Sequence, residues 1–168
     1  MTEFNRIGVV GRPGHAGVAT SLVRLFTFLQ NKKVKILMDE LTASLLDSPL
    51  VEIIPKNELG TKCDLVIVVG GDGSMLNVAK YLASDSVPVI GINRGKLGFL
   101  TDILPDEIET KIEEFLAGEY SVEKRFLLDV SKITDNKQEY LGSALNDIVL
   151  HPGSAAQMIE FELFVDDK

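Results

Sequence analysis

A buried strand that runs directly into a glycine-rich turn constrains this chain more than any other feature of its sequence. The strand is the apolar run 65–69, and the turn is Gly70-Gly71-Asp72-Gly73-Ser74. Apolar residues at helical spacing follow the turn: Met75, Leu76, Ala79, Leu82 and Ala83. An apolar run without alternation is typical of a strand that is covered on both faces. The pattern therefore predicts a strand, a sharp turn and a helix within a parallel α/β sheet.

The turn has the composition of a phosphate-binding site. Glycines let backbone amides approach a ligand closely, and the N-terminus of a helix favours anions. One carboxylate, Asp72, lies inside this turn, where phosphates would be expected. Phosphoryl transfer is a reaction that would explain a carboxylate in such a place. The alternative interpretation is that Asp72 only caps the helix, as Asp-Gly turns often do.

The segments around this strand predict an open α/β sheet. Apolar runs and helical spacing give further strands and helices, namely strands at 6–11, 34–38 and 86–92 and helices at 18–31, 39–46 and 105–117. The region 50–62 is expected to hold a strand fragment and a loop. Strand, helix and strand in succession imply parallel pairs with right-handed crossovers. We therefore expect residues 1–119 to form a nucleotide-binding domain, an open and mostly parallel sheet with helices on both faces.

The first turn of this domain is also rich in glycine, with glycines at positions 8, 11, 14 and 17. Their spacing does not match the G-x-G-x-x-G fingerprint of dinucleotide-binding Rossmann folds, and Asp39 is the one acid near the end of the second strand. We therefore do not predict an ordinary Rossmann site. The loop can still line a ligand site, because loops at the carboxyl ends of parallel strands usually do.

The pattern changes near Tyr120, where segments of alternating polarity replace strands and helices. Strands are expected near residues 126–130, 145–150 and 159–165, with a turn at 134–137. Residues 120–168 are thus expected to begin a β-rich second domain. The final apolar strand would have no partner, which is unfavourable at an edge. We therefore expect this sequence to be a fragment of a longer protein with an unfinished second domain.

Composition narrows the class of protein. A hydrophobic content of 45% in 168 residues is enough for a core, and no apolar run approaches the roughly 20 residues that cross a bilayer. The formal charge of −8 and the scattered basic residues argue against a nucleic-acid partner. The single Cys63 excludes an internal disulfide and indicates a reducing compartment. We expect a cytoplasmic protein with no membrane or nucleic-acid partner, and Cys63 as a small apolar residue beside a strand.

Four segments carry a resemblance to a known family. Residues 70–74 resemble the GGDG signature that NAD kinases share with 6-phosphofructokinases and with diacylglycerol and sphingosine kinases. Residues 7–12, 91–102 and 144–151 resemble bacterial NAD kinases specifically, and the resemblance extends through essentially the whole chain. It implies transfer of the γ-phosphoryl group of ATP to the adenosine ribose 2′-hydroxyl of NAD, which gives NADP. It also implies Mg²⁺ carried with the donor phosphates, without metal ligands from the protein.

The resemblance gives roles to residues of the turn. It assigns Asp72 as the base that takes the proton of the ribose hydroxyl, a task for which a carboxylate within hydrogen-bond reach is suited. Gly70, Gly71 and Gly73 would let phosphates approach the backbone. Ser74 would either add a hydroxyl contact or serve only as a first-turn residue. An Asp72→Asn variant is expected to bind NAD but to turn over about 10²–10⁴-fold more slowly.

Further expected NAD contacts lie later in the chain. The resemblance places Asn146 and Asp147 near the ribose hydroxyls and base of NAD. Without the resemblance, the pair would equally suit a solvated strand end. Because neighbours in a regular strand point to opposite faces, both can contact one ligand only at a strand end, a bulge or a bend. Phe99 would either stack on a base or belong to the core, and Gln157 falls where the family has a variable polar contact.

The chain departs from the family's pattern in one respect, and two alternative functions stay open. The family's β-rich domain continues well beyond residue 168 with a second motif rich in Gly, Thr and Ser, so the 168-residue chain alone is expected to be inactive. The alternatives are another kinase with the GGDG turn, acting on a lipid or a sugar, and a non-catalytic nucleotide-binding module. We also expect a homo-oligomer.

Overall fold

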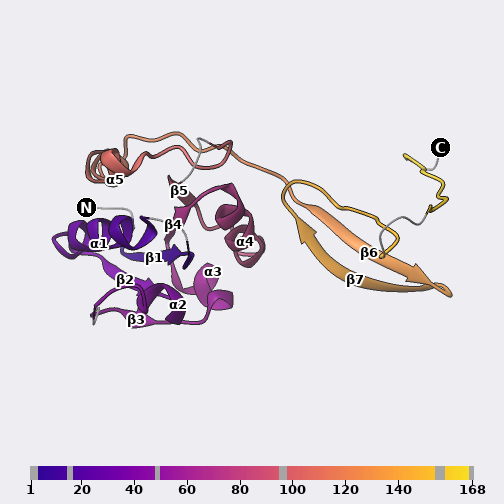
Figure 1. Cartoon of the computed structure of the whole chain (residues 1–168), viewed down its shortest axis with the longest axis horizontal. Coiled ribbons are helices and arrows are strands. Elements are labelled where there is room, and N and C mark those ends of the chain that lie inside the picture. Colours follow the sequence, from indigo (N-terminus) through magenta and orange to yellow (C-terminus); the bar gives the residue numbers. More distant parts are fainter. Residues whose placement is uncertain (1–3, 15–16, 48–49, 95–97, 154–157, 167–168) are drawn as a thin grey trace.

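A five-stranded parallel sheet forms the centre of the α/β unit (Figure 1). The computed structural model describes residues 4–14, 17–47, 50–94, 98–153 and 158–166. The strands of the sheet, in spatial order, are β3 (Glu52–Ile53), β2 (Lys35–Met38), β1 (Arg6–Gly11), β4 (Leu65–Gly70) and β5 (Val89–Asn93). Each neighbouring pair is parallel. The predicted α/β class with an open parallel sheet is confirmed.

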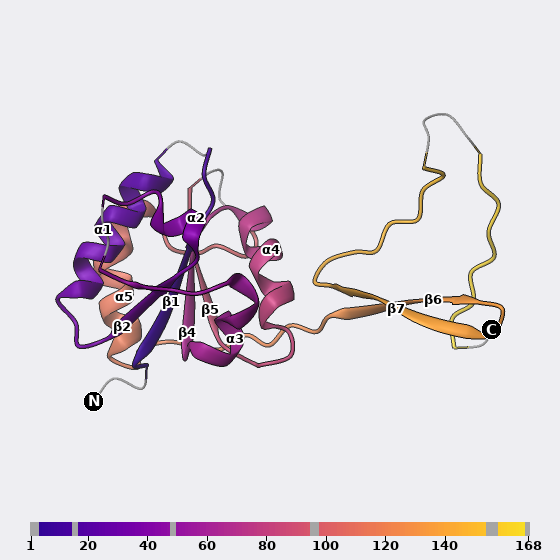
Figure 2. The same ribbon diagram turned by 90° about the horizontal axis from the view of Figure 1, so that it is seen from below.

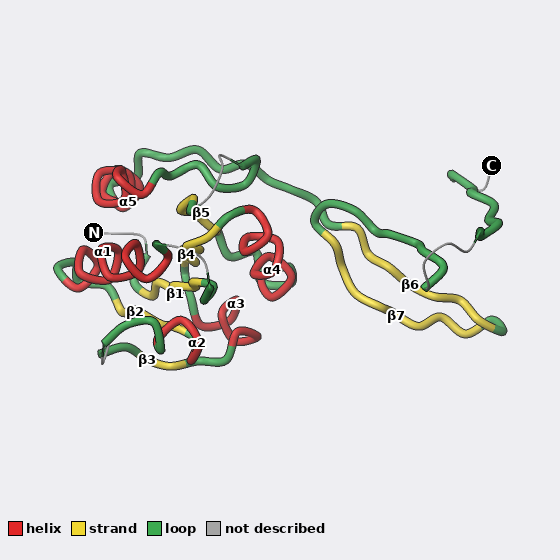
Figure 3. Tube along the Cα trace, viewed as in Figure 1, coloured by secondary structure: helices red, strands yellow, loops and turns green. Residues whose placement is uncertain are grey.

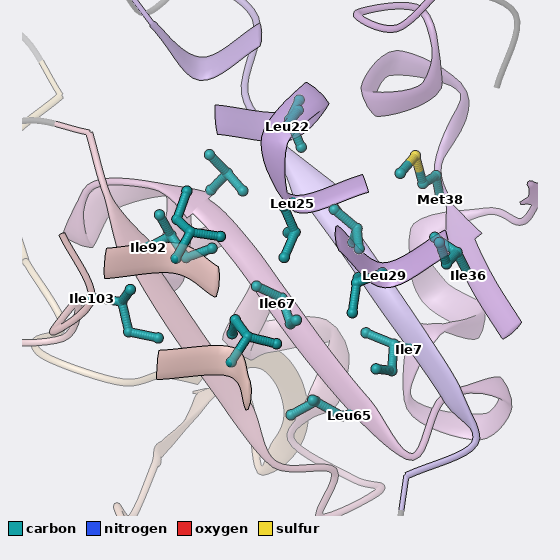
Figure 4. Packing of buried hydrophobic residues seen from close by; sticks show 14 of the residues in the cluster. Ile7, Leu22, Leu25, Leu29, Ile36, Met38, Leu65, Ile67, Ile92 and Ile103 are labelled. Carbon is teal, nitrogen blue, oxygen red and sulfur yellow. The ribbon is translucent and has the colours of Figure 1, made fainter. Parts of the chain in front are cut away.

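Helices cover both faces of this sheet (Figure 2). They are α1 (Val18–Gln30), α2 (Glu40–Ala43), η1 (Lys56–Glu58), α3 (Leu59–Lys62), α4 (Asp72–Leu82), η2 (Pro105–Glu107) and α5 (Ile108–Leu116). Alternate side chains of β4 enter two separate cores. Leu65, Ile67 and Val69 pack in the cluster that contains α1 and α5, whereas Val66 and Val68 pack in the cluster that contains α3 and α4. Figure 4 shows the first cluster, in which Ile67 lies among residues of β1, α1 and β5.

The boundaries of the predicted elements shift for physical reasons. β5 begins at Val89 rather than near residue 86, because Pro88 has no N–H to donate and only its carbonyl accepts, from Val66 N–H at 3.0 Å. The helix expected at 39–46 is shorter, since α2 ends at Ala43 and turns follow. The region 50–62 divides into β3, η1 and α3.

Beyond α5 the chain forms one hairpin, which lies apart from the α/β unit (Figures 1 and 3). Its strands are β6 (Leu128–Thr134) and β7 (Lys137–Ala144), joined by Asp135 and Asn136 with positive φ values of 51° and 59°. Two consecutive residues with positive φ are typical of a tight hairpin turn. The turn predicted at 134–137 is therefore confirmed.

The strands predicted at 145–150 and 159–165 are wrong, since the described residues of both segments form no strand. β6 and β7 pair from Thr134↔Lys137 to Leu128↔Ala144, so β7 runs out of partner residues at Ala144. A strand needs a neighbour to receive its backbone hydrogen bonds, and an alternating pattern does not supply one.

None of the helices in the described ranges is long and apolar enough to cross a membrane.

Candidate active site

The carboxyl ends of β1 and β4 lie side by side at the middle of the sheet. These strands are adjacent and parallel, and the order β3-β2-β1-β4-β5 reverses between them. The helices that follow them, α1 and α4, pack on opposite faces. In open α/β sheets, ligands bind outside the carboxyl ends of the strands at such a reversal. The glycine-rich turn after β4 therefore lies where a ligand site is expected.

The turn leads directly into α4. Gly71 is the N-cap residue, with extended φ and ψ of −98° and −172°, and the helix begins at Asp72. The Gly71 carbonyl accepts hydrogen bonds from Ser74 N–H at 2.9 Å and from Met75 N–H at 3.2 Å. No side chain caps this helix end. Asp72 therefore does not cap the helix, and its carboxylate is engaged elsewhere.

The Asp72 carboxylate binds the segment that follows β5. Phe99 N–H donates to Oδ2 at 2.8 Å, Leu100 N–H donates to Oδ1 at 3.1 Å, and the Thr101 hydroxyl donates to Oδ1 at 3.4 Å. A side chain at Gly98 would occupy the space that this carboxylate fills. Sequence reasoning missed these partners, because they lie 27 to 29 residues away from Asp72 and no local pattern signals them.

The glycines of the turn differ in what the fold requires of them. A Cβ at Gly70 would lie 2.6 Å from the Cβ of Ser74, which is itself only 8% exposed. Gly70 is therefore needed for packing, and Ser74 lies in the interior at the first turn of α4, where a hydroxyl contact to a ligand stays a prediction. A Cβ at Gly71 or Gly73 would meet nothing within 4 Å, and neither has a positive φ. The chain's own packing does not explain glycine at these two positions, whereas a ligand against the backbone would.

The end of β5 reaches across the same edge. Arg94 N–H donates to the carbonyl of Gly70 at 3.1 Å, which ties the end of β5 to the turn. The Arg94 guanidinium fills the space beside Gly17, the N-cap residue of α1. This half-buried side chain therefore brings a positive charge to the carboxyl edge of the sheet.

Phe99 lies next to the carboxylate through its backbone, while its ring is 91% exposed. The interpretation of Phe99 as a core residue is therefore wrong. An exposed aromatic ring has a face on which a nucleotide base can stack.

Asn146 and Asp147 lie beside α4. They line a cavity of about 220 Å³ together with Leu76 and Lys80 of that helix and the nearby residues Leu127, Ser143, Ala144 and Leu145. Asp72, Leu76 and Lys80 are spaced by four residues, so they follow one side of α4 and the cavity begins roughly 6 Å along the axis from Asp72. Asn146 and Asp147 are exposed and lie just after the end of β7. A position at a strand end is one of those expected to let two neighbouring residues contact one ligand. Gln157 lies outside the described residues.

Comparison with known proteins gives one family. The family model described as the ATP-NAD kinase N-terminal domain matches residues 7–120. The NAD kinase of Teredinibacter turnerae is 47% identical over 168 residues, which cover 100% of this chain and 57% of that protein. The NAD kinase of Azotobacter vinelandii is 49% identical over 166 residues, covering 99% of this chain and 56% of that protein. The chain thus spans little more than half the length of these curated relatives.

Solved structures agree on the fold. Yeast NADH kinase complexed with NADH has a TM-score of 0.73 at 21% identity, covering 84% of this chain and 47% of that chain. The NAD kinase from Archaeoglobus fulgidus in complex with ATP has a TM-score of 0.55 at 24% identity, covering 79% and 45%. At these identities the two matches bear on the fold alone.

Proposed function

The chain belongs to the ATP-NAD kinase family, and on that premise we propose that the protein containing it is an NAD kinase. It transfers the γ-phosphoryl group of ATP to the 2′-hydroxyl of the adenosine ribose of NAD, which forms NADP and ADP. One observation carries this proposal: a carboxylate, Asp72, is held at the start of α4 beside two glycines that the fold itself does not require. The names of the curated relatives, NAD kinases that match nearly the whole chain, support it further.

Asp72 acts as the base in this proposal. The ribose oxygen attacks the γ-phosphorus, its proton passes to the Asp72 carboxylate, and the bond to ADP breaks. Three donors from the segment after β5 occupy about three of the roughly four lone-pair positions of that carboxylate, so at least one remains for the ribose hydroxyl. Because phosphoryl transfer has a loose transition state, the main task of the site is to hold both substrates in line and to balance charge.

The donor phosphates lie against the turn. Gly71 and Gly73 leave the backbone open there, and the N-terminus of α4 offers amide hydrogens and a favourable dipole for an anion. Arg94 supplies positive charge at the same edge. Within the described ranges no cluster of three or more His, Cys, Asp or Glu residues is placed to hold a metal ion. In this proposal Mg²⁺ would arrive with the donor nucleotide and would neutralise part of its phosphate charge.

NAD extends from the turn along α4. Asn146 and Asp147 contact its ribose hydroxyls and base from the cavity beside Leu76 and Lys80, and Phe99 stacks on a base. Gln157 adds a further polar contact to NAD. The separation of roughly 6–12 Å between Asp72 and this cavity, one to two helical turns, suits an extended dinucleotide.

We also propose that the protein is a cytoplasmic homo-oligomer. Large apolar side chains are exposed in the part of the chain after residue 120, among them Val122, Phe126, Ile133, Phe161 and Leu163. Exposed apolar surface of this extent needs a protein cover, which either the remainder of the longer protein that the curated relatives represent or a second subunit can supply.

The identity of the acceptor tests the function. The protein that contains this chain is incubated with ATP and Mg²⁺ and with NAD, a diacylglycerol or fructose 6-phosphate, and the products are identified by ³¹P NMR. We expect one new phosphomonoester signal, with NAD only, and a product that an NADP-specific dehydrogenase reduces. Phosphorylation of the lipid or the sugar instead would assign another kinase of the GGDG group. NAD binding by calorimetry without any transfer would assign a non-catalytic module.

A further inference from the structure

The segment 98–103 runs beside β5 and is fixed to the sheet at its far end. Asn93 N–H donates to the carbonyl of Ile103 at 2.8 Å, and Ile103 N–H donates to the carbonyl of Gly91 at 3.2 Å. Ile103 also forms a parallel bridge with Ile92. Thr101 is fully buried, and its methyl carbon packs so close to Gly91 that a Cβ there would lie only 2.6 Å from it. The far end of the segment is therefore held by β5.

At the near end of the segment, hydrogen bonds to Asp72 add to the packing of the half-buried Leu100 on the core cluster that contains α3 and α4. Both carboxylate oxygens accept, Oδ2 from Phe99 N–H and Oδ1 from Leu100 N–H and the Thr101 hydroxyl. Hydrogen bonds to an ionised acceptor are about twice as strong as those between neutral groups. Because donors reach both oxygens, rotation of the carboxylate about its Cβ–Cγ bond is fixed.

We propose that Asp72 has a second task besides proton transfer: its carboxylate fastens the segment 98–103 to the start of α4. Gly98 and Thr101 are then positioning residues, since Gly98 leaves the space that the carboxylate fills and Thr101 donates to one of its oxygens. The attachment stands on the contacts themselves. Its effect on turnover rests on the proposed kinase function.

This attachment couples the Asp72 carboxylate to the aromatic ring of Phe99. One donor to the carboxylate is the backbone N–H of Phe99, so the carboxylate also sets where the exposed ring lies. In Asp72→Asn an amide nitrogen replaces one oxygen and faces an N–H donor, which breaks one of the two backbone contacts. We therefore expect this variant to raise the KM for NAD as well as to lower kcat, a change from the expectation drawn from the sequence.

Amide hydrogen exchange tests the attachment without any nucleotide. In Asp72→Ala the exchange of the Phe99 and Leu100 amides is expected to be roughly 10–100-fold faster than in the unmodified chain, because both lose a charged acceptor. The matched control is Asp102→Ala, which removes an exposed carboxylate from the same segment. It is expected to leave both amides unchanged. Unchanged exchange in Asp72→Ala, or equal acceleration in the control, would overturn the attachment.

Turnover of NAD tests the positioning role. Thr101→Val keeps the shape but removes the hydroxyl, and we expect kcat to fall roughly tenfold while the KM for ATP is unchanged. Thr101→Ser retains the donor and should recover most of kcat. Thr61→Val, the same change at an exposed position of α3, is the control. A Thr101→Val enzyme as active as the control would contradict the positioning role. Absence of NAD phosphorylation by the unmodified protein would overturn the proposed function, whereas the exchange result decides the attachment on its own.

Discussion

Gly70 and Gly73, both in the turn after β4, are explained by different physical requirements. Gly70 makes room for the buried Ser74, whereas Gly73 lies within α4 and faces open space. A glycine in a helix is less favourable than alanine by roughly 0.5–1 kcal/mol. Its presence at position 73 therefore lowers stability, and the gain is backbone that a phosphate can approach.

Alanine substitutions separate these two reasons. Gly73→Ala is expected to raise the free energy of unfolding by about 0.5 kcal/mol and to weaken ATP binding, because the new methyl group stands where phosphates approach. Gly70→Ala is expected to lower the free energy of unfolding by about 1–3 kcal/mol through overpacking against Ser74. Urea unfolding and calorimetric titration with ATP measure both effects. A Gly73→Ala protein that binds ATP normally would show that the phosphates do not pass this position.

Cys63 lies in the core, as expected for a small apolar residue beside a strand. Its thiol is 4% exposed, and its Sγ would lie 2.8 Å from a Cβ at Gly8. Burial raises the pKa of the Cys63 thiol to about 11, so the reactive thiolate is scarce at neutral pH.

Alkylation of the thiol checks this burial. With iodoacetamide at pH 8, we expect the folded protein to react at least about 100-fold more slowly than the urea-unfolded protein, in which the thiol has an ordinary pKa. Mass spectrometry follows the reaction. Similar rates in the two states would mean that Cys63 is accessible in the folded protein.

At the scale of elements, Asp64 joins β1 to β4 at the amino ends of these strands. Its Oδ2 accepts from Asn5 N–H at 3.0 Å and from Arg6 N–H at 2.9 Å, and its Oδ1 accepts from the Arg6 guanidinium at 2.7 Å. The side-chain hydrogen bond from Arg6 is the main reason that the pKa of Asp64 is lowered. This contribution to stability is fully present above the unfolded pKa, near 3.9, and is lost as the pH falls through the folded value.

Asp64→Asn should therefore be destabilising in a pH-dependent manner. We expect a loss of about 1 kcal/mol near pH 7, since the pair is partly exposed and screened. The difference from the unmodified protein should shrink as the pH falls below about 4. Urea unfolding at several pH values measures it. A difference that stays constant with pH would show that the charge of Asp64 is not involved.

Most of the α/β sheet could be predicted because its signals are local. The apolar run 65–69 and the helical spacing after Pro105 each lie within one element, and both elements form where expected. The contact from Asp72 to the segment 98–103 could not be predicted, because periodicity carries no information about residues that far apart in sequence. The strands predicted at 145–150 and 159–165 are wrong for a related reason. Alternating polarity indicates which face of a strand is apolar, but a strand also needs a neighbouring strand to pair with.

At the scale of the whole molecule, the chain changes character at Tyr120. This ring packs on Phe115 with centroids 4.4 Å apart, and Phe115 stacks on Phe4 at 5.0 Å. Residues 121–126 are exposed and lead to the hairpin without a helix or strand, as Figure 2 shows. We propose that the α/β domain comprises residues 1–119 and that the second domain begins at Tyr120, whose ring packs on the α/β domain at the boundary and precedes the exposed connection.

Limited proteolysis tests this boundary. Lys124 and Arg125 lie in the exposed connection, so trypsin should cut there before it cuts within the sheet or its helices. The N-terminal product should keep its helical circular dichroism and unfold cooperatively. First cuts within residues 17–47 or 50–94 would contradict the boundary.

If Asp72 takes the proton of the ribose hydroxyl, its replacement slows the chemical step, and a single turnover measures the rate of that step. NADP formation in a single turnover at saturating ATP and NAD is compared for the unmodified protein, Asp72→Asn and Asp135→Asn. The last variant makes the same change at an exposed hairpin position with positive φ, which asparagine also adopts readily. We predict a loss of about 10²–10⁴-fold for Asp72→Asn and no loss for Asp135→Asn. An Asp72→Asn protein that transfers the phosphoryl group at the unmodified rate would show that Asp72 is not the base.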